Sequence, residues 1–387
     1  MKNKILTFLS YVLVAALAVT VTLGVESVLD QPHQSGESKL EQLEELILDK
    51  FIGEADQTAM EDAAAEAMIG AIGDRWSYYI SAKDYAAYME QMNNAYVGIG
   101  VTISALEDGG FEIIQVNAGG PAEEAGLQVG DIIVGVDGQS VMEMDTNACR
   151  DLVRGKEGTF VQITVNRTGQ EQTFNVERKT VQTAVATAEM LEGNVGLITI
   201  VNFDARCYTE TKAAIDELLQ QGAVSLIFDV RYNPGGYKTE LVKLLDYLLP
   251  EGPLFHSEDY LGNTSVDESD ADCLDIPMAV LVNGSSYSAA EFFAAALSEY
   301  EAAVIVGEKT TGKGHFQNTF KLPDGSAVAL SVGRYKTPKG VSLEGVGITP
   351  DVIIAVDEET AYYIYAGTLD PMEDPQILAA LDALKNE

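Results

Sequence analysis

The sequence predicts a multidomain α/β protein with a helical N-terminal segment, a small β-rich module and an α/β domain built on a mixed sheet. Three patterns lead to this division. Apolar residues recur at helical spacing in residues 40–92, short alternating runs separated by glycines fill residues 95–178, and apolar strands alternate with helices from residue 181. A length of 387 residues leaves room for two or three domains. The expected segments are 1–30, 31–94, 95–178 and 179–387.

The first of these segments resembles a membrane anchor. Residues 5–25 form an uncharged, mostly apolar run of 21 residues, preceded by Lys2 and Lys4. At 1.5 Å per residue such a helix spans about 30 Å, which is enough to cross a bilayer. The lysines place the N-terminus in the cytoplasm and the remaining chain outside. We expect an uncleaved single-helix anchor and an extracytoplasmic body; the alternative is a protein secreted after signal-peptide cleavage. Residues 30–37 are polar and indicate a short linker.

Composition argues against nucleic acid as a partner and against a disulfide framework or a zinc site. A net charge of −36 argues against nucleic acid, whose phosphates attract Lys and Arg, and is typical of a solvated acidic surface. Cys149, Cys207 and Cys273 lie far apart and form no C-x-x-C motif. Their spacing indicates neither a disulfide framework nor a zinc site, so we expect small buried residues. The sequence indicates no metal and no cofactor.

The stretch with the strongest chemical signal is residues 283–317. An apolar strand (277–282) ends in a Gly/Ser turn, and a helix rich in Ala and Phe (289–297) follows. Ser288 therefore lies at a strand-to-helix turn beside the free N–H groups of a helix start, a suitable place for a nucleophile. The alternative is structural: Ser288 and Glu291 fit a capping box, S-x-x-E, in which the serine only caps the helix.

A second turn follows another apolar strand. Residues 225–230 run directly into R-Y-N-P-G-G. Active sites of such sheets lie at the carboxyl ends of strands, where both this turn and Ser288 are expected. An ordinary tight turn is the alternative reading of N-P-G-G.

Eight motifs, in the right order and with the right gaps, resemble the carboxyl-terminal processing peptidases, also called tail-specific proteases. They are GDRWSYYIS, YVGIGV, PAEEAGLQVGDIIVGVDG, LVRGKEGT, DVRYNPGG, VNGSSYSAAE, GEKTTGKGHFQ and GVGITPDV. The resemblance covers about residues 40–355. It implies a serine peptidase core with a Ser–Lys pair, and it implies that the β-rich module is an inserted PDZ domain.

The resemblance implies roles for individual residues. Ser288 matches the nucleophile, Lys313 the general base and Gln317 the residue that orients the lysine. Lys313 follows Ser288 by 25 positions (313 minus 288), which is the family's separation. Lys309 stands where the family usually has proline, so it is a rival base by chemistry, although not by spacing. The glycines flanking Lys313 favour it, because they let its backbone approach neighbouring chain closely. The family often has T-A-S-A-S-E at the nucleophile; here Ala290 replaces the later serine.

A lysine acts as a base only when it is neutral. Its ordinary pKa of about 10.4 has to fall by roughly 3 units, about 4 kcal/mol of disfavoured charge, and burial can supply this. Gln317 can hydrogen-bond the amine without adding a negative charge. A Ser-His-Asp triad is poorly supported, since His33 lies in the linker and His256 has no partner motif. His315 and Lys313 would point to opposite faces if that segment were a strand.

In this reading the oxyanion hole consists of the Ala289 N–H and one N–H of the Gly235–Gly236 turn. Pro234 makes the turn rigid and the glycines keep it open. The PDZ carboxylate loop would be Tyr96, Val97, Gly98, Ile99 and Gly100. It would hold the terminal carboxylate of an apolar C-terminal tail, which adds as an extra strand. Arg154 is either a transmitter of the bound state to the peptidase core or an ordinary surface arginine.

We therefore expect a membrane-anchored serine endopeptidase that cleaves near protein C-termini. A catalytically inactive PDZ scaffold is the first alternative, and the presence of Ser288, Lys313, Gln317 and N-P-G-G weighs against it. A Ser-His lipase or esterase is the second, but the chain lacks the G-x-S-x-G elbow at Ser288. The family further suggests a homodimer and an activating partner protein.

Overall fold

The computed structural model of the protein describes residues 38–106 and 108–385. The predicted anchor or signal segment and its linker lie outside these residues. Within them, no helix is both long and apolar enough to cross a membrane. The chain divides into two compact units, one reaching Met68 and one beginning at Ile69.

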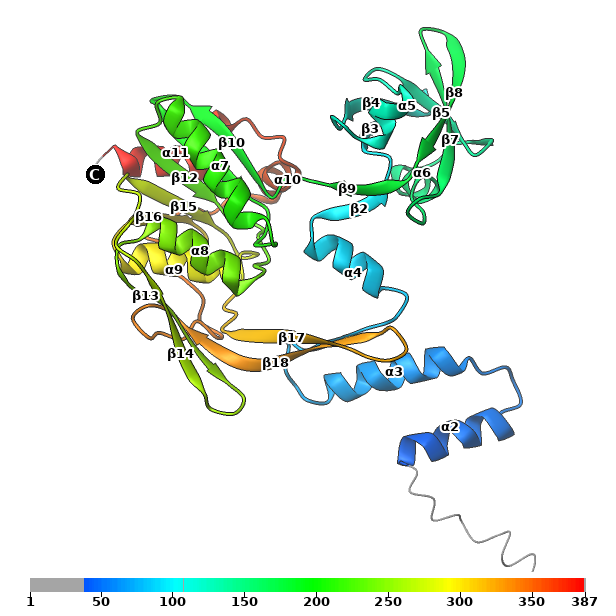
Figure 1. The fold of residues 1–387 in the computed structure, drawn as a ribbon, viewed down its shortest axis with the longest axis horizontal. Coiled ribbons are helices and arrows are strands. Elements are labelled where there is room, and N and C mark those ends of the chain that lie inside the picture. The colour runs from blue at the N-terminus through cyan, green and yellow to red at the C-terminus, as the bar shows by residue number, and fades with distance from the viewer. Residues whose placement is uncertain (1–37, 107, 386–387) are drawn as a thin grey trace, which may run out of the picture. The chain divides into compact units, whose positions relative to one another are not determined.

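The N-terminal unit is helical, as predicted. It contains α2 (Lys39–Lys50) and most of α3 (Gln57–Gly70) (Figure 1). A capping box starts α2, since Ser38 N–H donates to Glu41 Oε2 and Glu41 N–H donates to Ser38 Oγ. Neither helix contains a buried residue. The apolar positions at helical spacing on α2 therefore remain exposed, including Leu40, Leu43 and Leu46.

The β-rich module of the second unit is an antiparallel sheet in the order β3-β4-β5-β7-β8, with β6 added beside β5. Its elements are β3 (Val101–Ala105), β4 (Phe111–Val116), α5 (Pro121–Ala125), β5 (Ile132–Val136), β6 (Gln139–Ser140), α6 (Thr146–Val153), β7 (Phe160–Arg167) and β8 (Gln170–Glu177). The module has a hydrophobic core of its own. The chain enters through β2 (Ala95–Gly98) and leaves through β9 (Lys179–Gln182), which pair antiparallel. Strand β3 lies at the edge of the sheet.

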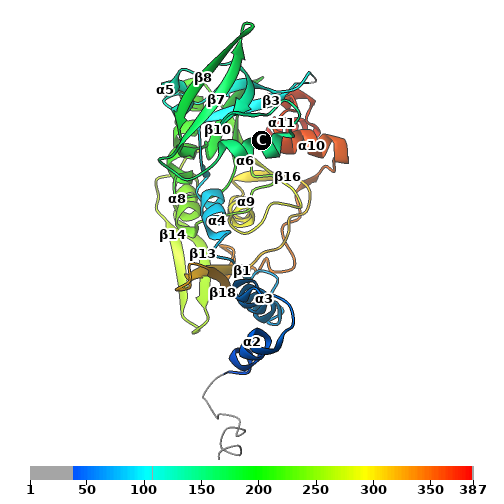
Figure 2. The same ribbon diagram turned by 90° about the vertical axis from the view of Figure 1, so that its right-hand side faces the viewer.

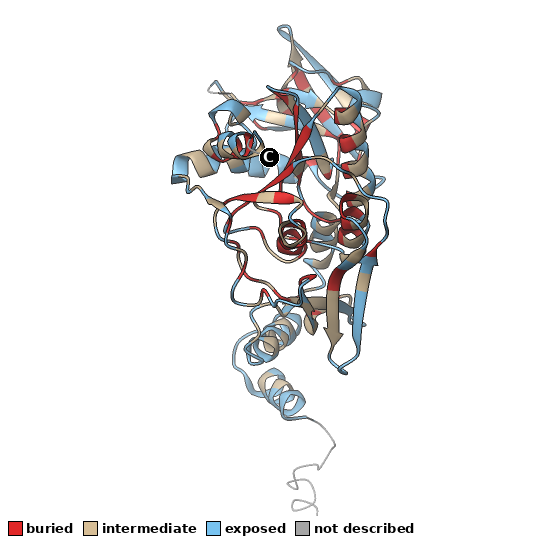
Figure 3. Cartoon of the chain, turned by 90° about the vertical axis from the view of Figure 1, so that its left-hand side faces the viewer, coloured by how far each residue is buried: buried red, intermediate tan, exposed pale blue. Residues whose placement is uncertain are grey.

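The α/β domain is built on a six-stranded mixed sheet in the order β10-β11-β12-β15-β16-β19. These strands are β10 (Ala186–Leu191), β11 (Val195–Ile200), β12 (Ser225–Asp229), β15 (Met278–Val282), β16 (Ala303–Gly307) and β19 (Val352–Ile353). Only the β10–β11 pair is antiparallel. Buried residues, red in Figure 3, are concentrated in this domain, and every residue of β12 and β15 is buried.

Helices cover both faces of this sheet. They are α7 (Cys207–Gln220), α8 (Lys238–Leu248) and α9 (Ala289–Glu299) on one face and α11 (Pro375–Leu384) on the other (Figure 1). The period-2 alternation of strands explains the division. Leu226 and Phe228 of β12 pack with α7, α8 and α9, whereas Ile227 between them packs with Ile377 and Leu381 of α11.

A second, antiparallel sheet lies in the same unit. Its order is β1-β18-β13-β14, with β17 on β18, and β13 and β14 form a long hairpin (Figure 2). The strands are β1 (Tyr78–Ile80), β13 (Gly252–Asp259), β14 (Thr264–Ser269), β17 (His315–Lys321) and β18 (Ala327–Lys336). The remaining elements are α4 (Tyr85–Met92), α10 (Glu358–Ala366) and the 3-10 turn Pro371–Glu373.

Two details differ from the sequence-based expectation. Strand β1 interrupts residues 40–92, which showed a helical pattern, because its three residues pair with Ala327–Ala329 of β18.

All three cysteines are free, and Cys149 and Cys207 are buried as predicted. The prediction was wrong for Cys273, which is exposed in the segment between β14 and β15.

A buried ion network joins the end of β12 to α11. The Arg231 guanidinium donates to both Asp229 oxygens, and its Nη1 donates to Asp374 Oδ2 at 2.7 Å and to Gln376 Oε1 at 2.9 Å. Asp374 Oδ1 in turn caps α11 by accepting the N–H of Gln376. This network therefore holds the C-terminal helix against the strand that leads into the R-Y-N-P-G-G turn.

We predict that Asp374→Ala lowers the free energy of unfolding by about 3 kcal/mol, because it removes one partner of a buried charge and a helix cap. Denaturant unfolding measures this change. Asp382→Ala, which removes an exposed carboxylate of the same helix, serves as the control and is expected to change stability by less than about 0.5 kcal/mol. Equal losses in the two variants would contradict the assigned role of the network.

Candidate active site

Three loops meet at one edge of the main sheet. They follow β12 (residues 230–236), β15 (residues 283–288) and β16 (residues 308–314). Strand β15 pairs in parallel with both β12 and β16, so the carboxyl ends of all three strands lie together. The three loops carry R-Y-N-P-G-G, Ser288 and Lys313, respectively.

Ser288 lies at the strand-to-helix turn that the sequence predicted. It is half-buried and immediately precedes α9, whose residues Ala289–Leu297 are all buried. Its backbone has φ 58° and ψ −123°, outside the regions that L-residues ordinarily occupy. Backbone strain of this kind persists only where the surroundings hold it, and it is frequent at functional sites.

The buried carboxylate of Glu291 joins the serine turn to the lysine loop. Its Oε2 accepts the N–H of Ser288 at 3.1 Å and the N–H of Lys313 at 2.8 Å. Its Oε1 accepts the N–H of Gly312 at 2.7 Å and the hydroxyl of Thr310 at 2.5 Å. Burial raises the pKa of the Glu291 carboxyl, and the four hydrogen bonds oppose that rise. From the sequence, Glu291 was expected only as the partner of Ser288 in a helix cap, because S-x-x-E spacing does not show the second loop.

Lys313 lies in the loop before β17, between two glycines at which the chain passes very close to a neighbouring loop. A Cβ at Gly312 would lie 2.9 Å from Gly347 N, and one at Gly314 would lie 2.7 Å from Glu344 N. The close approach expected at these glycines is therefore present. Burial lowers the pKa of Lys313 to about 8, against the opposing effect of nearby carboxylates, Asp74 first.

Two aromatic rings flank the Lys313 amine. Its Nζ lies 5.0 Å from the ring centroid of Trp76 and 5.6 Å from that of Tyr287, and the two rings stack at 6.3 Å. Among the described residues, Nζ forms no hydrogen bond or ion pair. The Trp76 indole N–H donates to Glu344 Oε1 at 3.0 Å, and this carboxylate also accepts the Gly314 N–H. Trp76 and Tyr287 both lie in the quoted family motifs, but the sequence did not indicate that either ring lies beside the lysine.

The remaining candidate bases and the orienting residue form other contacts. Lys309 is exposed, as a solvated surface lysine would be. Gln317 donates to His315 O at 3.2 Å and to Ser331 Oγ at 3.1 Å, so its orienting role toward Lys313 stays a prediction. His315 Nδ1 lies 3.6 Å from Glu344 Oε2, and His256 Nε2 lies 3.0 Å from Pro338 O. Within the described residues, neither histidine hydrogen-bonds Ser288.

The glycine turn packs directly against the start of α9. A Cβ at Gly235, whose φ is +88°, would lie 2.8 Å from both Ala289 N and Ser288 Cβ. The Gly235 N–H donates to Asn233 Oδ1 at 2.8 Å, so it is already occupied. Within the described chain, the N–H groups of Gly236 and Ala289 have no acceptor, which leaves these two donors available to a ligand.

The predicted carboxylate loop lies at the entry to the β-rich module. Tyr96, Val97 and Gly98 belong to β2 and pair with β9, whereas the Ile99 and Gly100 carbonyls accept the N–H groups of Ala122 and Asn117. Edge strand β3 begins directly after Gly100.

Arg154 follows α6 and is exposed. Its guanidinium lies 5.1 Å from the ring centroid of Tyr96. The candidate transmitter thus contacts the first residue of the candidate peptide-binding loop.

Comparisons with known proteins agree with this architecture. The model of peptidase family S41 matches residues 194–354, and a PDZ domain model matches residues 112–167. The carboxy-terminal processing protease CtpA of Bacillus subtilis is 32% identical over 362 residues, covering 91% of this chain and 78% of the relative. A CtpA-like serine protease of Staphylococcus saprophyticus is 30% identical over 369 residues, covering 92% and 73%.

A solved structure assigned to the S41 proteases, from Bacteroides fragilis, shares the fold. It has a TM-score of 0.51 and 20% identity, covering 83% of this chain and 90% of that chain. The match to the S41 family model and the similarity to CtpA confirm the sequence-based assignment to the family. The chain belongs to peptidase family S41, among the CtpA-like carboxy-terminal processing serine proteases.

Proposed function

We propose that the protein is a serine endopeptidase that cleaves protein substrates near their C-termini, with Ser288 as nucleophile and Lys313 as general base. The observation that carries the proposal is the shared carboxylate of Glu291. One of its oxygens accepts the backbone N–H groups of both residues and so keeps the two loops together. The strained backbone of Ser288 supports its role.

In the proposed mechanism, neutral Lys313 removes the proton of Ser288 Oγ while Oγ attacks the scissile carbonyl carbon. This step requires a hydrogen bond between the Lys313 amine and Ser288 Oγ. The resulting ammonium then donates the proton to the leaving amine, and water releases the acyl group by the same route. Gln317 is proposed to hold the amine during the transfer without adding charge.

The developing oxyanion is proposed to accept hydrogen bonds from the Ala289 and Gly236 N–H groups. Neither has an acceptor within the described chain, and both flank the point where Gly235 contacts Ser288. Each such donor is typically worth about 10²–10³ in rate.

Substrate tails are proposed to bind the PDZ domain, for which we propose residues 95–178. The edge position of β3 supports this, since an extended peptide can add there as a further strand while residues 96–100 hold its carboxylate. Arg154, through its contact with Tyr96, is proposed to sense the bound tail.

We further propose extracytoplasmic action with anchoring through residues 1–30, in line with their apolar sequence. Exposed leucines on α2 support self-association into a homodimer. An activating partner protein would fit a resting state in which the Lys313 amine lies beside two aromatic rings and, within the described residues, forms no hydrogen bond with Ser288.

The first test compares Ser288→Ala, Lys313→Ala and Lys309→Ala in the full-length chain. The substrate is an unstructured protein with an apolar C-terminus. We expect kcat to fall at least about 10³-fold in the first two variants, because the nucleophile and the base act as a unit. Lys309→Ala should remain near wild type. Full activity in Lys313→Ala would place the base elsewhere, and a wild type that neither cleaves nor reacts with a fluorophosphonate would favour a binding scaffold.

The second test is the pH dependence of kcat/KM. Burial lowers the pKa of Lys313 to about 8, so the lysine is mostly protonated and inactive as a base below that pH. Activity is expected to rise tenfold per pH unit below about 8 and to level off above it. A profile that levels off near pH 7 would contradict a lysine base and favour a histidine, whose ordinary pKa is about 6.5.

The third test is Glu291→Gln. The amide offers one acceptor oxygen where four donors converge, and its NH₂ group faces N–H groups. We expect kcat to fall roughly 10- to 100-fold, because the serine and lysine loops lose their common partner. Glu189→Gln, at an exposed position on β10, is the matched control. Wild-type kcat in Glu291→Gln would show that the shared carboxylate does not position the site.

A further inference from the structure

We propose that Tyr232 is a positioning residue that fixes the glycine turn of the oxyanion hole and couples this turn to helix α10. The inference rests on the proposed function and concerns a residue to which the family resemblance assigns no role. Tyr232 lies in the R-Y-N-P-G-G turn, four positions before Gly236 (236 minus 232).

The backbone of Tyr232 is strained. Its φ is 58°, in the left-handed region that bulky side chains rarely adopt. Such a conformation persists only where neighbouring groups hold it. The turn therefore depends on whatever contacts keep Tyr232 in place.

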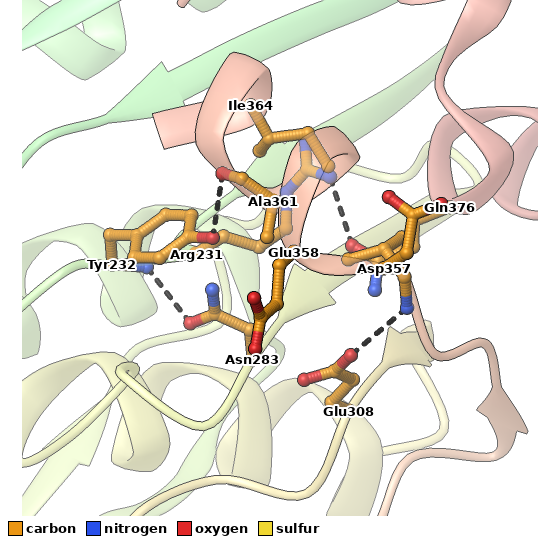
Figure 4. A pocket seen from close by; sticks show the side chains of 10 residues that line it. Arg231, Tyr232, Asn283, Glu308, Asp357, Glu358, Ala361, Ile364 and Gln376 are labelled. Carbon is orange, nitrogen blue, oxygen red and sulfur yellow. Dashed lines mark hydrogen bonds between the residues drawn. The ribbon is translucent and has the colours of Figure 1, made fainter. Parts of the chain in front are cut away.

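Three contacts hold Tyr232, and they come from two directions. Its N–H donates to Asn283 Oδ1 at 3.0 Å, on the turn that leads to Ser288. Its hydroxyl donates to the Ala361 carbonyl at 3.0 Å, in the middle of α10. Its ring meets the Tyr365 ring edge-on, with centroids 5.2 Å apart. Figure 4 shows Tyr232 between Asn283 and the α10 residue Ala361.

The conformation of Tyr232 sets the direction of the next residue, Asn233, which is fully buried. Asn233 donates from Nδ2 to Ile200 O at 2.8 Å and accepts the Gly235 N–H on Oδ1. Its carbonyl accepts the Tyr287 N–H, directly beside Ser288. Through Asn233, the conformation of Tyr232 therefore determines where the Gly236 N–H lies relative to Ser288.

Helix α10 has few other supports near this turn. None of its residues is buried, and a cavity of about 130 Å³ lies between it and the turn, lined by Arg231, Tyr232, Glu308 and Ile364 among others (Figure 4). Because the space beneath the helix is not filled by side chains, the Tyr232 hydroxyl is a principal link between α10 and the site. A displacement of α10 would then change the position of the glycine turn.

The test is Tyr232→Phe, which removes the hydroxyl and keeps the ring. Tyr362→Phe is the matched control, since it removes the hydroxyl of a tyrosine on α10 that is 66% exposed. In full-length protein, we expect Tyr232→Phe to slow both kcat and acylation of Ser288 by a fluorophosphonate about tenfold, with KM unchanged. Tyr362→Phe should match wild type. Wild-type acylation in Tyr232→Phe would overturn the proposal.

A second variant separates positioning from folding. Tyr232→Gly relieves the backbone strain but loses both side-chain contacts with α10. We expect acylation at least as slow as in Tyr232→Phe; a wild-type rate would overturn the proposal. Hydrogen exchange gives a readout independent of activity, and exchange in residues 231–237 and 358–366 should be faster in both variants. If wild type reacted with no fluorophosphonate, the proposed function would fail, while unchanged exchange would overturn the coupling itself.

Discussion

The arrangement of the site depends on one buried carboxylate. Glu291 belongs to a helix whose first nine residues are buried, so its position is set by the packing of α9 on the main sheet. From there it accepts N–H groups of two loops that follow the neighbouring strands β15 and β16. A buried carboxylate without partners is costly, and four donors make this one tolerable. The same hydrogen bonds that satisfy Glu291 thus fix the Ser288 turn and the Lys313 loop relative to each other.

Opposing influences act on Lys313. Burial favours its neutral form, whereas the aromatic rings of Trp76 and Tyr287 and the carboxylates of Asp74 and Glu344 favour the cation. Burial is the largest effect, so the pKa falls. A lysine balanced in this way changes protonation state when its surroundings change slightly, which suits the role of general base proposed for Lys313.

On the other side of Ser288, two asparagine side chains hold the glycine turn through its backbone N–H groups. Asn283 accepts the N–H of Tyr232, and Asn233 accepts the N–H of Gly235. Each amide satisfies one backbone donor of the turn, and the Gly236 N–H is left without an acceptor within the described chain. The C-terminal part of the chain contributes through α10 at Tyr232 and through Asp374 at Arg231. Two successive residues of one turn are therefore held by segments more than a hundred positions away.

Much of the local structure follows from the sequence. Apolar runs place β12 and β15 within about one residue of their observed bounds, and the S-x-x-E and N-P-G-G patterns place both turns. The eight motifs identify the family, and the glycines around Lys313 indicate a close backbone approach. Local patterns do not show, however, that Trp76 stacks on Tyr287, that Glu291 reaches the lysine loop, or that the Gly235 N–H is occupied. These contacts join residues far apart in the chain and depend on which strands are neighbours. Periodicity and turn chemistry act over a few residues, so they determined the elements, whereas the parallel pairing of three strands decided which side chains meet.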